Sequence, residues 1–287
     1  MIQFDIAKMD FSNHDDHKSN IFNKDILNPK ELYDKILSNG EVSIHEIVAL
    51  NYAVSLIKPE TKAKLKKIIK FYSYNYQYYS LNWLDVSEIT DMSFLFYRSE
   101  YNGDISQWDV SNVTNMSNMF TKSQFDQDIS KWDVSKVTNM AGMFAGSLFD
   151  EKISNWDVSN VKNMADMFAK SQFNQDISQW DVSKVTNMAG MFAKSQFNQD
   201  ISQWDVSKVT NMEFIFAESK FNQNIGQWDI SRVKSMAGMF VKSLFYKNIS
   251  GWDVSNVMNV AGMFAESQIQ NTSWVISNMT IKDHMYK

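Results

Sequence analysis

The chain has 287 residues, 44% of them hydrophobic, which is enough apolar material for a folded core in one or two domains. Its formal net charge is −5, from 28 Lys and Arg against 33 Asp and Glu, which excludes a strongly basic nucleic-acid-binding protein as the default. The lack of Cys excludes disulfides, thiolate zinc sites and thiol nucleophiles.

Four segments are predicted along the chain. They are a polar, poorly ordered N-terminal segment (1–27), a helical cap (28–80), a repeat region of about eight coils (81–271) and a C-terminal cap (272–287). The segment H-D-D-H at 14–17 has metal-ligand side chains, but we interpret it as part of the polar N-terminal segment. No apolar run reaches the ~20 residues of a membrane span.

Three helices are predicted in the cap. Asn28 and Pro29 supply an N-cap and a first-position Pro, and Gly40 predicts the end of that helix. Ser43 and Glu46 predict a capping box before a second helix, and Pro59 predicts the start of a third. We expect these helices to cover the open first coil, because the end of a repeat stack otherwise exposes its apolar interior.

The repeat region has a strict period of 24 residues. Its frame is W-D-V-S-x-V-x-N-M-x-x-M-F-x-x-S-x-F-x-x-x-I-S-x, and an earlier copy starts at Leu84 with Leu in the Trp position. Propeller blades need about 40 residues, so a period of this length predicts a solenoid. The Trp residues that mark the period are Trp108, Trp132, Trp156, Trp180, Trp204, Trp228 and Trp252.

The apolar spacing within a coil predicts its local structure. The W-x-V step of two indicates a short strand with both side chains inward, and M-x-x-M-F indicates one helical turn. The predicted fold is therefore α+β: a right-handed, leucine-rich-repeat-like solenoid of 24-residue coils with short parallel strands, one helical turn per coil and a helical N-terminal cap. Trp, Met and Phe of successive coils should form internal columns.

The frame VTNM-x-x-MF-x-x-S-x-FNQDIS-x-WDVS resembles the BspA-like leucine-rich repeat proteins, specifically the Mycoplasma-type surface-lipoprotein repeat. The resemblance covers about Leu84 to Ile269 and recurs in every coil. The family often carries a small residue or Cys where this chain has Ser, as at Ser123 and Ser171. The resemblance implies a surface-exposed or secreted protein with an adhesion or binding role. Met1–Phe11 lacks the apolar region of a signal peptide, so a cytoplasmic location stays open.

An Asp follows the Trp position in each coil, and stacked neighbours would repel by ~0.9 kcal/mol even in water. Three explanations are open. The Asp side chain can accept hydrogen bonds from the Ser two residues later in a D-V-S Asx turn. The Asp residues can instead bind a row of cations. The basic residues three positions later can also neutralise them. We favour the turn, because Ca²⁺-binding coils are Gly-rich and this frame is not.

Three further polar columns are interpreted as structural. Asp104, Asp128, Asp176 and Asp200 are expected on a solvated face. Asn115, Asn139, Asn163, Asn187, Asn211 and Asn259 are expected to form an internal ladder whose amides bond to the backbone of adjacent coils. Thr114, Thr138, Thr186 and Thr210 form a parallel ladder whose spacing is typical of ice-binding faces, but Lys162, Lys234 and Met258 interrupt it.

The candidate binding face lies beside the Trp column, where Gln, Asp and Lys or Arg recur in each coil. Solenoids use such extended faces to bind partners. The candidate residues are Gln107, Asp109, Asp133, Lys136, Gln179, Asp181, Lys184, Gln203, Asp205, Lys208, Gln227, Asp229 and Arg232.

Catalysis is not expected. All four His (His14, His17, His45 and His284) lie outside the repeats, and the sequence has no phosphate-binding Gly loop. We therefore predict a non-enzymatic scaffold, without cofactor or metal, that binds a protein or glycan partner and no nucleic acid. Two alternatives remain: a structural or antigenic surface spacer, and an intracellular interaction module that uses the N-terminal helices. The oligomeric state is not predicted.

Overall fold

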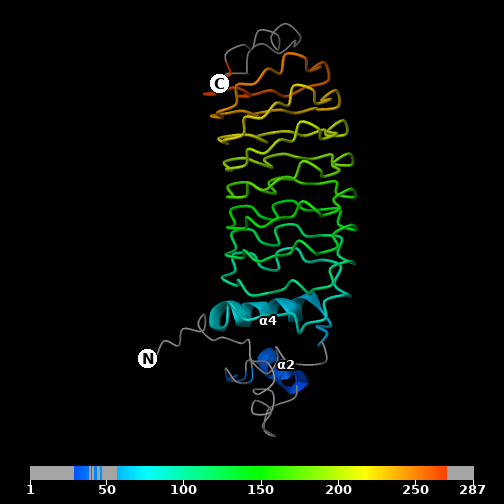
Figure 1. Cartoon of the computed structure of the whole chain (residues 1–287), viewed down its shortest axis with the longest axis vertical. Coiled ribbons are helices and arrows are strands. Elements are labelled where there is room, and N and C mark those ends of the chain that lie inside the picture. Colours follow the sequence, from blue (N-terminus) through cyan, green and yellow to red (C-terminus); the bar gives the residue numbers. More distant parts are fainter. Residues whose placement is uncertain (1–28, 39, 41, 44–45, 47–56, 270–287) are drawn as a thin grey trace. The chain divides into compact units, whose positions relative to one another are not determined.

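The computed structural model describes residues 29–38, 40, 42–43, 46 and 57–269. The chain divides into two compact units, Met1–Ile57 and Lys58–Lys287. The boundary falls inside the predicted cap, so the cap is not one unit. The described residues contain two helices, α2 (Pro29–Leu37) and α4 (Lys62–Asn75), and no strand longer than a single bridge (Figure 1). The predicted segments 1–27 and 272–287 lie outside the described residues.

In the first unit, the predicted helix start and capping box are both present. Helix α2 begins at Pro29 and ends at Leu37, and the N–H of Gly40 donates to the carbonyl of Lys35 at 2.9 Å. The Ser43 N–H donates to Glu46 Oε2 at 2.6 Å, and the Glu46 N–H donates to Ser43 Oγ at 3.3 Å. The helix that this capping box was predicted to open lies outside the described residues.

Helix α4 begins at Lys62, three residues after Pro59, where the third helix was predicted to begin. Thr61 is its N-cap, because the Thr61 hydroxyl accepts the Lys64 N–H at 3.2 Å and so satisfies a free donor of the first turn. The prediction from Pro59 was wrong in this boundary. The buried side of α4 consists of Leu65, Ile68, Ile69, Tyr72 and Ser73.

Helix α4 lies across the first coil, as a cap should. Lys62 Nζ donates to Asp91 Oδ2 at 2.9 Å and to Ser93 Oγ, and the hydroxyls of Ser73 and Ser99 are 2.6 Å apart. These contacts join the helix to the coil that precedes all others in the stack.

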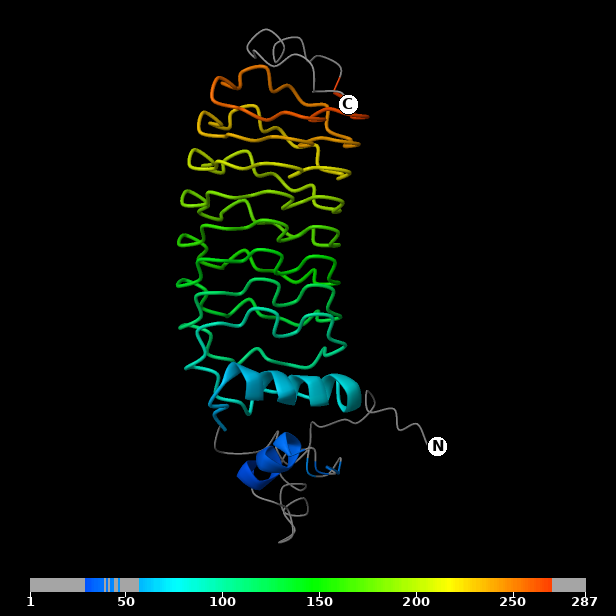
Figure 2. The same cartoon turned by 180° about the vertical axis from the view of Figure 1, so that it is seen from behind.

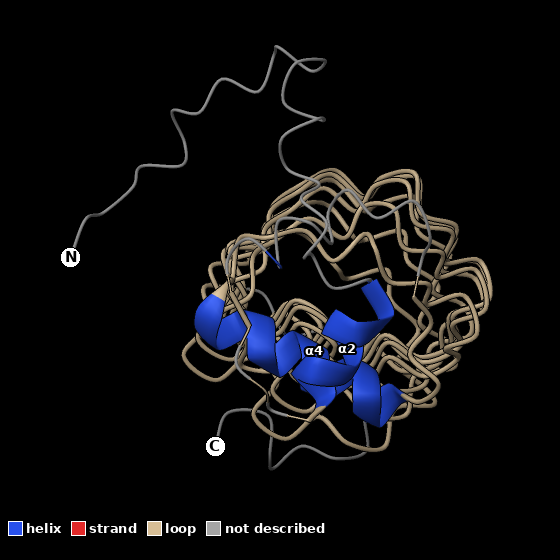
Figure 3. Cartoon of the chain, turned by 90° about the horizontal axis from the view of Figure 1, so that it is seen from below, coloured by secondary structure: helices blue, strands red, loops and turns tan. Residues whose placement is uncertain are grey.

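Each coil of 24 residues lies directly on the preceding one (Figures 1 and 2), and the coils superimpose in a view along the stack (Figure 3). We number the positions of a coil 1 to 24 from the Trp position and letter the coils A to H. They start at Leu84, Trp108, Trp132, Trp156, Trp180, Trp204, Trp228 and Trp252.

A one-way ladder of backbone hydrogen bonds joins the coils at positions 9, 11, 13 and 15. In coil B, the N–H of Met116 donates to the carbonyl of Asn139 at 2.9 Å, and the N–H of Lys122 donates to the carbonyl of Ala145 at 2.8 Å. The N–H groups between them close turns within the coil, such as Met119 to the carbonyl of Met116 at 3.2 Å. The ladder therefore pairs the backbone groups of this segment almost completely.

The segment M-x-x-M-F is consequently a series of tight turns, not the predicted helical turn. Positions 11 and 15 have φ between +53° and +64° in every coil, and such left-handed residues interrupt a right-handed helix. Parallel pairing is present as one bridge per coil at position 8, as in Asn115 with Asn139, where short strands were predicted. The assignment to a right-handed, leucine-rich-repeat-like solenoid stays a prediction.

The interior confirms the inward orientation of the Trp column. All seven indoles are only 3–4% exposed. Each indole N–H donates to the carbonyl of the residue 27 positions earlier at 2.9–3.2 Å, as in Trp180 to Ile153. Beside this column, the Phe rings of position 13 stack from Phe96 to Phe264 with centroids 5.1 to 6.0 Å apart.

Candidate binding surface

Aspartate occupies position 2 in all eight coils, and each of these residues closes a turn. Its Oδ1 accepts the N–H of the Ser at position 4 at 2.9–3.0 Å. This contact confirms the predicted D-V-S Asx turn. The residues are Asp85, Asp109, Asp133, Asp157, Asp181, Asp205, Asp229 and Asp253.

The same contacts lower the pKa of several of these carboxyl groups. Hydrogen bonds from the hydroxyl and then the backbone N–H of the following Ser hold the pKa of Asp133, Asp181 and Asp229 below its ordinary value. The neighbouring cation adds to the effect, as Arg232 does for Asp229. The turn and the basic column together therefore account for the stacked charges. Within the described residues, no group of three or more His, Asp or Glu is arranged to hold a metal ion.

Every residue of the predicted binding face is exposed. The structure brings its columns together: Lys136 Nζ donates to Asn112 Oδ1 of the preceding coil at 2.7 Å, and Lys184 Nζ donates to Asn160 Oδ1 at 2.8 Å. Gln179 Nε2 donates to the hydroxyl of its neighbour Ser178 at 3.2 Å. Much of the hydrogen-bonding capacity of this face is thus used within the protein.

The second Asp column is exposed, as predicted, but it also has a function in the fold that sequence analysis missed. Its Oδ1 atoms accept the N–H two residues on at 2.8 Å and close a second Asx turn in the coil. The signal was available in the sequence, because D-I-S repeats the spacing of D-V-S. The residues are Asp104, Asp128, Asp176 and Asp200.

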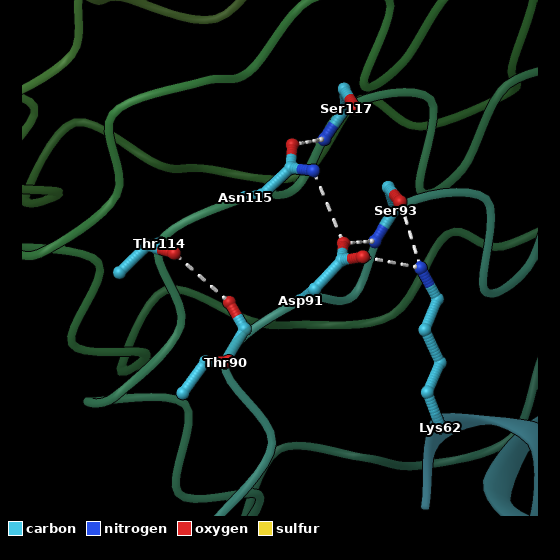
Figure 4. Close-up of polar contacts among 7 residues, drawn as sticks. All are labelled: Lys62, Thr90, Asp91, Ser93, Thr114, Asn115 and Ser117. Atoms are coloured by element: carbon cyan, nitrogen blue, oxygen red, sulfur yellow. Dashed lines mark hydrogen bonds and ion pairs between the residues drawn. The ribbon is translucent and has the colours of Figure 1, made fainter.

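The Asn column at position 8 differs from the predicted internal ladder. Asn115 is only half-buried, and its Oδ1 accepts the N–H of Ser117 at 3.1 Å within the same coil (Figure 4). Its Nδ2 donates to the side chain of Asp91 at 3.1 Å, not to the backbone of the adjacent coil. The prediction was wrong because the backbone at this position already pairs with the next coil through its own N–H and carbonyl groups. The Thr114 hydroxyl does donate to the carbonyl of Thr90 in the preceding coil at 3.2 Å.

The side-chain ladder between coils lies instead at position 19. There each side-chain oxygen accepts the backbone N–H of position 19 in the next coil, at 2.8–3.1 Å, from Asn102 to Tyr246. Sequence analysis missed this column, although an Asn or Asp directly after the aromatic residue of position 18 in six consecutive coils was a usable signal. The accepting residues are Asn102, Asp126, Asp150, Asn174, Asn198 and Asn222.

Positions 10, 11, 14 and 15 form a second surface, which we call the turn face; most of its small residues are buried or half-buried, and its long side chains at position 15 are exposed. Ala fills most of positions 10 and 14, and Gly or a left-handed residue fills position 11. Across coils B, C and D this surface is hollowed by about 310 Å³. The floor contains Gly142 and Gly146. The rims carry Asn118, Lys122, Asp166 and Lys170. The remaining lining residues are Thr121, Ala141, Ala145, Ala165 and Ala169.

One rim of this hollow carries an electrostatically unusual carboxyl group. Burial raises the pKa of Asp166, and the ammonium group of Lys170 only partly opposes the rise. Asp166 is exposed as a residue, but its Oδ1 lies in the space that a Cβ on Gly190 of the next coil would occupy, so this glycine covers one side of the carboxylate. Sequence analysis did not single out this residue, because its position is variable among the coils.

Large apolar side chains also lie exposed on the turn face. Phe94 and Tyr97 of coil A are 44% and 41% exposed, and their ring centroids are 5.7 Å apart. The guanidinium of Arg98 lies 5.8 Å from the centroid of Tyr97. Phe214 of coil F is 49% exposed on the same face. The surface thus combines aromatic rings, small residues and cations.

Several sequence features cannot be placed on either face. The H-D-D-H segment and all four His lie outside the described residues. Among the residues that the structure does describe, no helix is long and apolar enough to span a membrane.

Comparison with known proteins identifies one family. The sequence model of the family described as "Mycoplasma protein of unknown function, DUF285" matches four overlapping segments, 64–172, 122–220, 145–242 and 194–287. Together these matches span residues 64–287, which include most of helix α4 and every coil. No curated protein matches the sequence, and no solved structure matches the chain.

Proposed function

From the premise that the chain belongs to the Mycoplasma proteins of unknown function DUF285, a family matched here by overlapping repeats, we propose that it is a non-enzymatic scaffold that binds a protein or glycan partner over an extended surface of its coils. The observation that carries this proposal is the register of the exposed side chains. The same polar groups recur at the same position of successive stacked coils, so a long partner would meet a regular array of contacts.

We further propose that the stack is a leucine-rich-repeat-like solenoid of the BspA type. The stacked 24-residue coils, the single parallel bridge per coil and the buried Trp, Met and Phe columns support this assignment. Surface adhesion or host interaction would follow from the resemblance, and it is the context in which we expect the partner to be found.

The non-enzymatic character is supported by the chemistry of the repeated columns. Acid–base catalysis needs groups whose environments differ, so that one is protonated and the other is not. The Asp residues of position 2 instead share one environment, in which each accepts the N–H of the Ser two residues on. Such uniformity is typical of residues that maintain a fold.

The proposal is tested by screening the whole chain against arrays of glycans and of extracellular proteins at physiological salt. We expect retention of at least one ligand class. Deletion of coils D and E together (156–203) preserves the frame and should weaken the retention, because an extended interface loses contacts in proportion to its length. A chain that retains nothing on either array would contradict the proposal.

A structural spacer is the second candidate, and one observation favours it. The cations and amides of the predicted binding face donate to neighbouring side chains, as Lys184 does to Asn160, and so have fewer free groups for a partner. For a spacer, deletion of coils D and E would change length without changing retention.

A further inference from the structure

We propose that the turn face of coils A to E binds an acidic polysaccharide, whose chain crosses the hollow with one carboxylate near Lys122 and the next near Lys170. This inference rests on the proposed function, because it names the class of partner and the place of contact. It transfers the contact from the face predicted from the sequence to the turn face.

The hollow exists because one coil lacks a side chain that the others have. Position 15 carries a long side chain in coils A, B and D to H, and Gly146 is its counterpart in coil C. A Cβ on Gly146 would meet only Lys122 Cγ, at 3.4 Å, so packing does not require a glycine there. Its φ of +63° is close to the +58° of Lys170 and Lys194 at the same position. Gly146 therefore opens a space that the fold itself would allow to be filled.

The charge around the hollow selects an anion. In coils A to E, the turn face carries four cations, Arg98, Lys122, Lys170 and Lys194, against the single carboxylate of Asp166, although the whole chain has a net charge of −5. Lys194 is paired with Glu218 at 2.9 Å.

The two lysines of the hollow have no such contact. Among the described residues, no hydrogen bond or ion pair joins the ammonium groups of Lys122 or Lys170 to a partner at contact distance. The two residues are two coils apart, which corresponds to about 10 Å along the stack. That spacing is close to the length of a disaccharide, so an alternating acidic polysaccharide can present a carboxylate near each lysine.

The floor of the hollow favours a glycan over an acidic peptide. Extended peptides bind sheet edges through main-chain hydrogen bonds. Here the N–H of Gly142 donates to the carbonyl of Ala165, the N–H of Gly146 donates to that of Ala169, and the carbonyl of Gly142 accepts the N–H of Ala145. The floor consequently offers a flat surface of Gly and Ala with few free main-chain groups.

The aromatic rings of coil A extend this surface along the stack. The exposed rings of Phe94 and Tyr97 present apolar faces on which the C–H face of a sugar ring can lie. Arg98, over Tyr97, places a further cation beside them. A chain of several sugar units can thus contact rings at one end and the lysine-flanked hollow at the other.

The test is calorimetric titration of the full chain at about 0.15 M salt, where diffuse attraction is screened. The probe is a hexasaccharide of alternating glucuronate and N-acetylglucosamine, compared with the neutral hexamer of N-acetylglucosamine and with a hexaglutamate peptide. We expect the acidic hexasaccharide to bind at least tenfold more tightly than either comparison ligand. Tighter binding of hexaglutamate would assign the face to acidic peptides and overturn the proposal, as would no binding of the acidic hexasaccharide.

Variants locate the binding. Combining Lys122→Gln with Lys170→Gln should weaken it about tenfold or more, because charged hydrogen bonds are lost. Gly146→Glu should abolish it, because it fills the hollow with a carboxylate; Glu218 and Glu266 show that Glu is accepted at this position with φ of 53° and 54°. A thermal melt verifies that each variant is folded.

Two further variants separate the hollow from general charge attraction and from the other face. Gly146→Lys adds a cation but fills the space, so we expect weaker binding, and tighter binding would overturn the proposal. Lys184→Gln, on the face predicted from the sequence, should change nothing. If Lys184→Gln weakens binding while Gly146→Glu does not, the hollow is refuted and the scaffold function survives. The scaffold function itself fails only when neither array retains any ligand.

Discussion

Substitution of Trp180 by Ala tests the central feature of the interior. The indole is 3% exposed, and its N–H donates to the carbonyl of Ile153 in the preceding coil at 3.1 Å. The ring also lies 6.3 Å, centroid to centroid, from that of Phe168. The variant therefore loses core volume, a hydrogen bond and a ring contact between coils in one step.

The expected loss of stability follows from these contacts. Truncation of a buried Trp to Ala costs about 3–5 kcal/mol through the cavity that remains. The carbonyl of Ile153 also loses its donor, which adds about 1 kcal/mol. In a unit of this size each kcal/mol lowers the melting temperature by about 2–4 °C, so we expect a decrease of roughly 10–20 °C.

Thermal and urea unfolding followed by circular dichroism provide the assay. Coils contact only their neighbours, so the damaged coil should also divide the melt into two transitions. Trp180→Phe isolates the hydrogen bond and should cost about 1–2 kcal/mol. Gln179→Ala, at the exposed neighbouring position, should stay within about 0.5 kcal/mol of the native protein. A Trp180→Ala protein that melts at the native temperature would refute the inward packing of the indoles.

Three other perturbations have expected outcomes. Asn198→Ala removes the acceptor of the Asn222 N–H and should cost about 1 kcal/mol in urea unfolding, whereas Asn198→Asp should be neutral, since Asp126 occupies the same position. Asp166→Gly should stabilise by about 1 kcal/mol, because it relieves a left-handed φ of +55° and removes a carboxyl group whose pKa is raised by burial; destabilisation would contradict this reading. Asp133 and Asp181 at position 2 have pKa values lowered by their Ser contacts, so they stabilise the protein above the unfolded pKa of about 3.9, and stability should fall as the pH drops through the lower folded values. A Tm that is constant from pH 5 to pH 3 would contradict the contribution of the Asx turns. A Tm that changes by several degrees when calcium is chelated would support the explanation that the Asp column binds cations.

The sequence was sufficient to predict the coil length, the buried Trp column and the D-V-S turn. Trp180 and its equivalents define the coil length, and their apolar character requires an interior, so their inward orientation followed from periodicity alone. The D-V-S turn followed in the same way, because an Asp side chain reaches its own backbone two residues on without help from the rest of the fold. Such local interactions depend only on residues that are neighbours in the chain.

Features that depend on the path of the backbone were harder to predict. The segment M-x-x-M-F has helical spacing, but its position 11 is left-handed, and the Gly at this position in coils C, E, G and H was a signal that sequence analysis missed. Phe94 and Arg98 in the first coil carry no such signal. Their conformation results from the ladder between coils, which directs every second N–H toward the next coil. The Asn ladder was predicted at the wrong position for the same reason. A side-chain ladder forms where the backbone N–H is not already used by the backbone ladder, and the sequence does not show where that ladder ends.

The two candidate binding surfaces differ in the same way in how far the sequence predicts them. The sequence by itself determined the period, the buried columns and the exposure of the polar face, because each repeats in every coil and averages over local variation. Only the tertiary structure decided that Gly146 lies between Lys122 and Lys170 and opens a hollow there. Residues 24 positions apart become neighbours only when coils stack, so a site built from the differences between coils has no signature within any one of them.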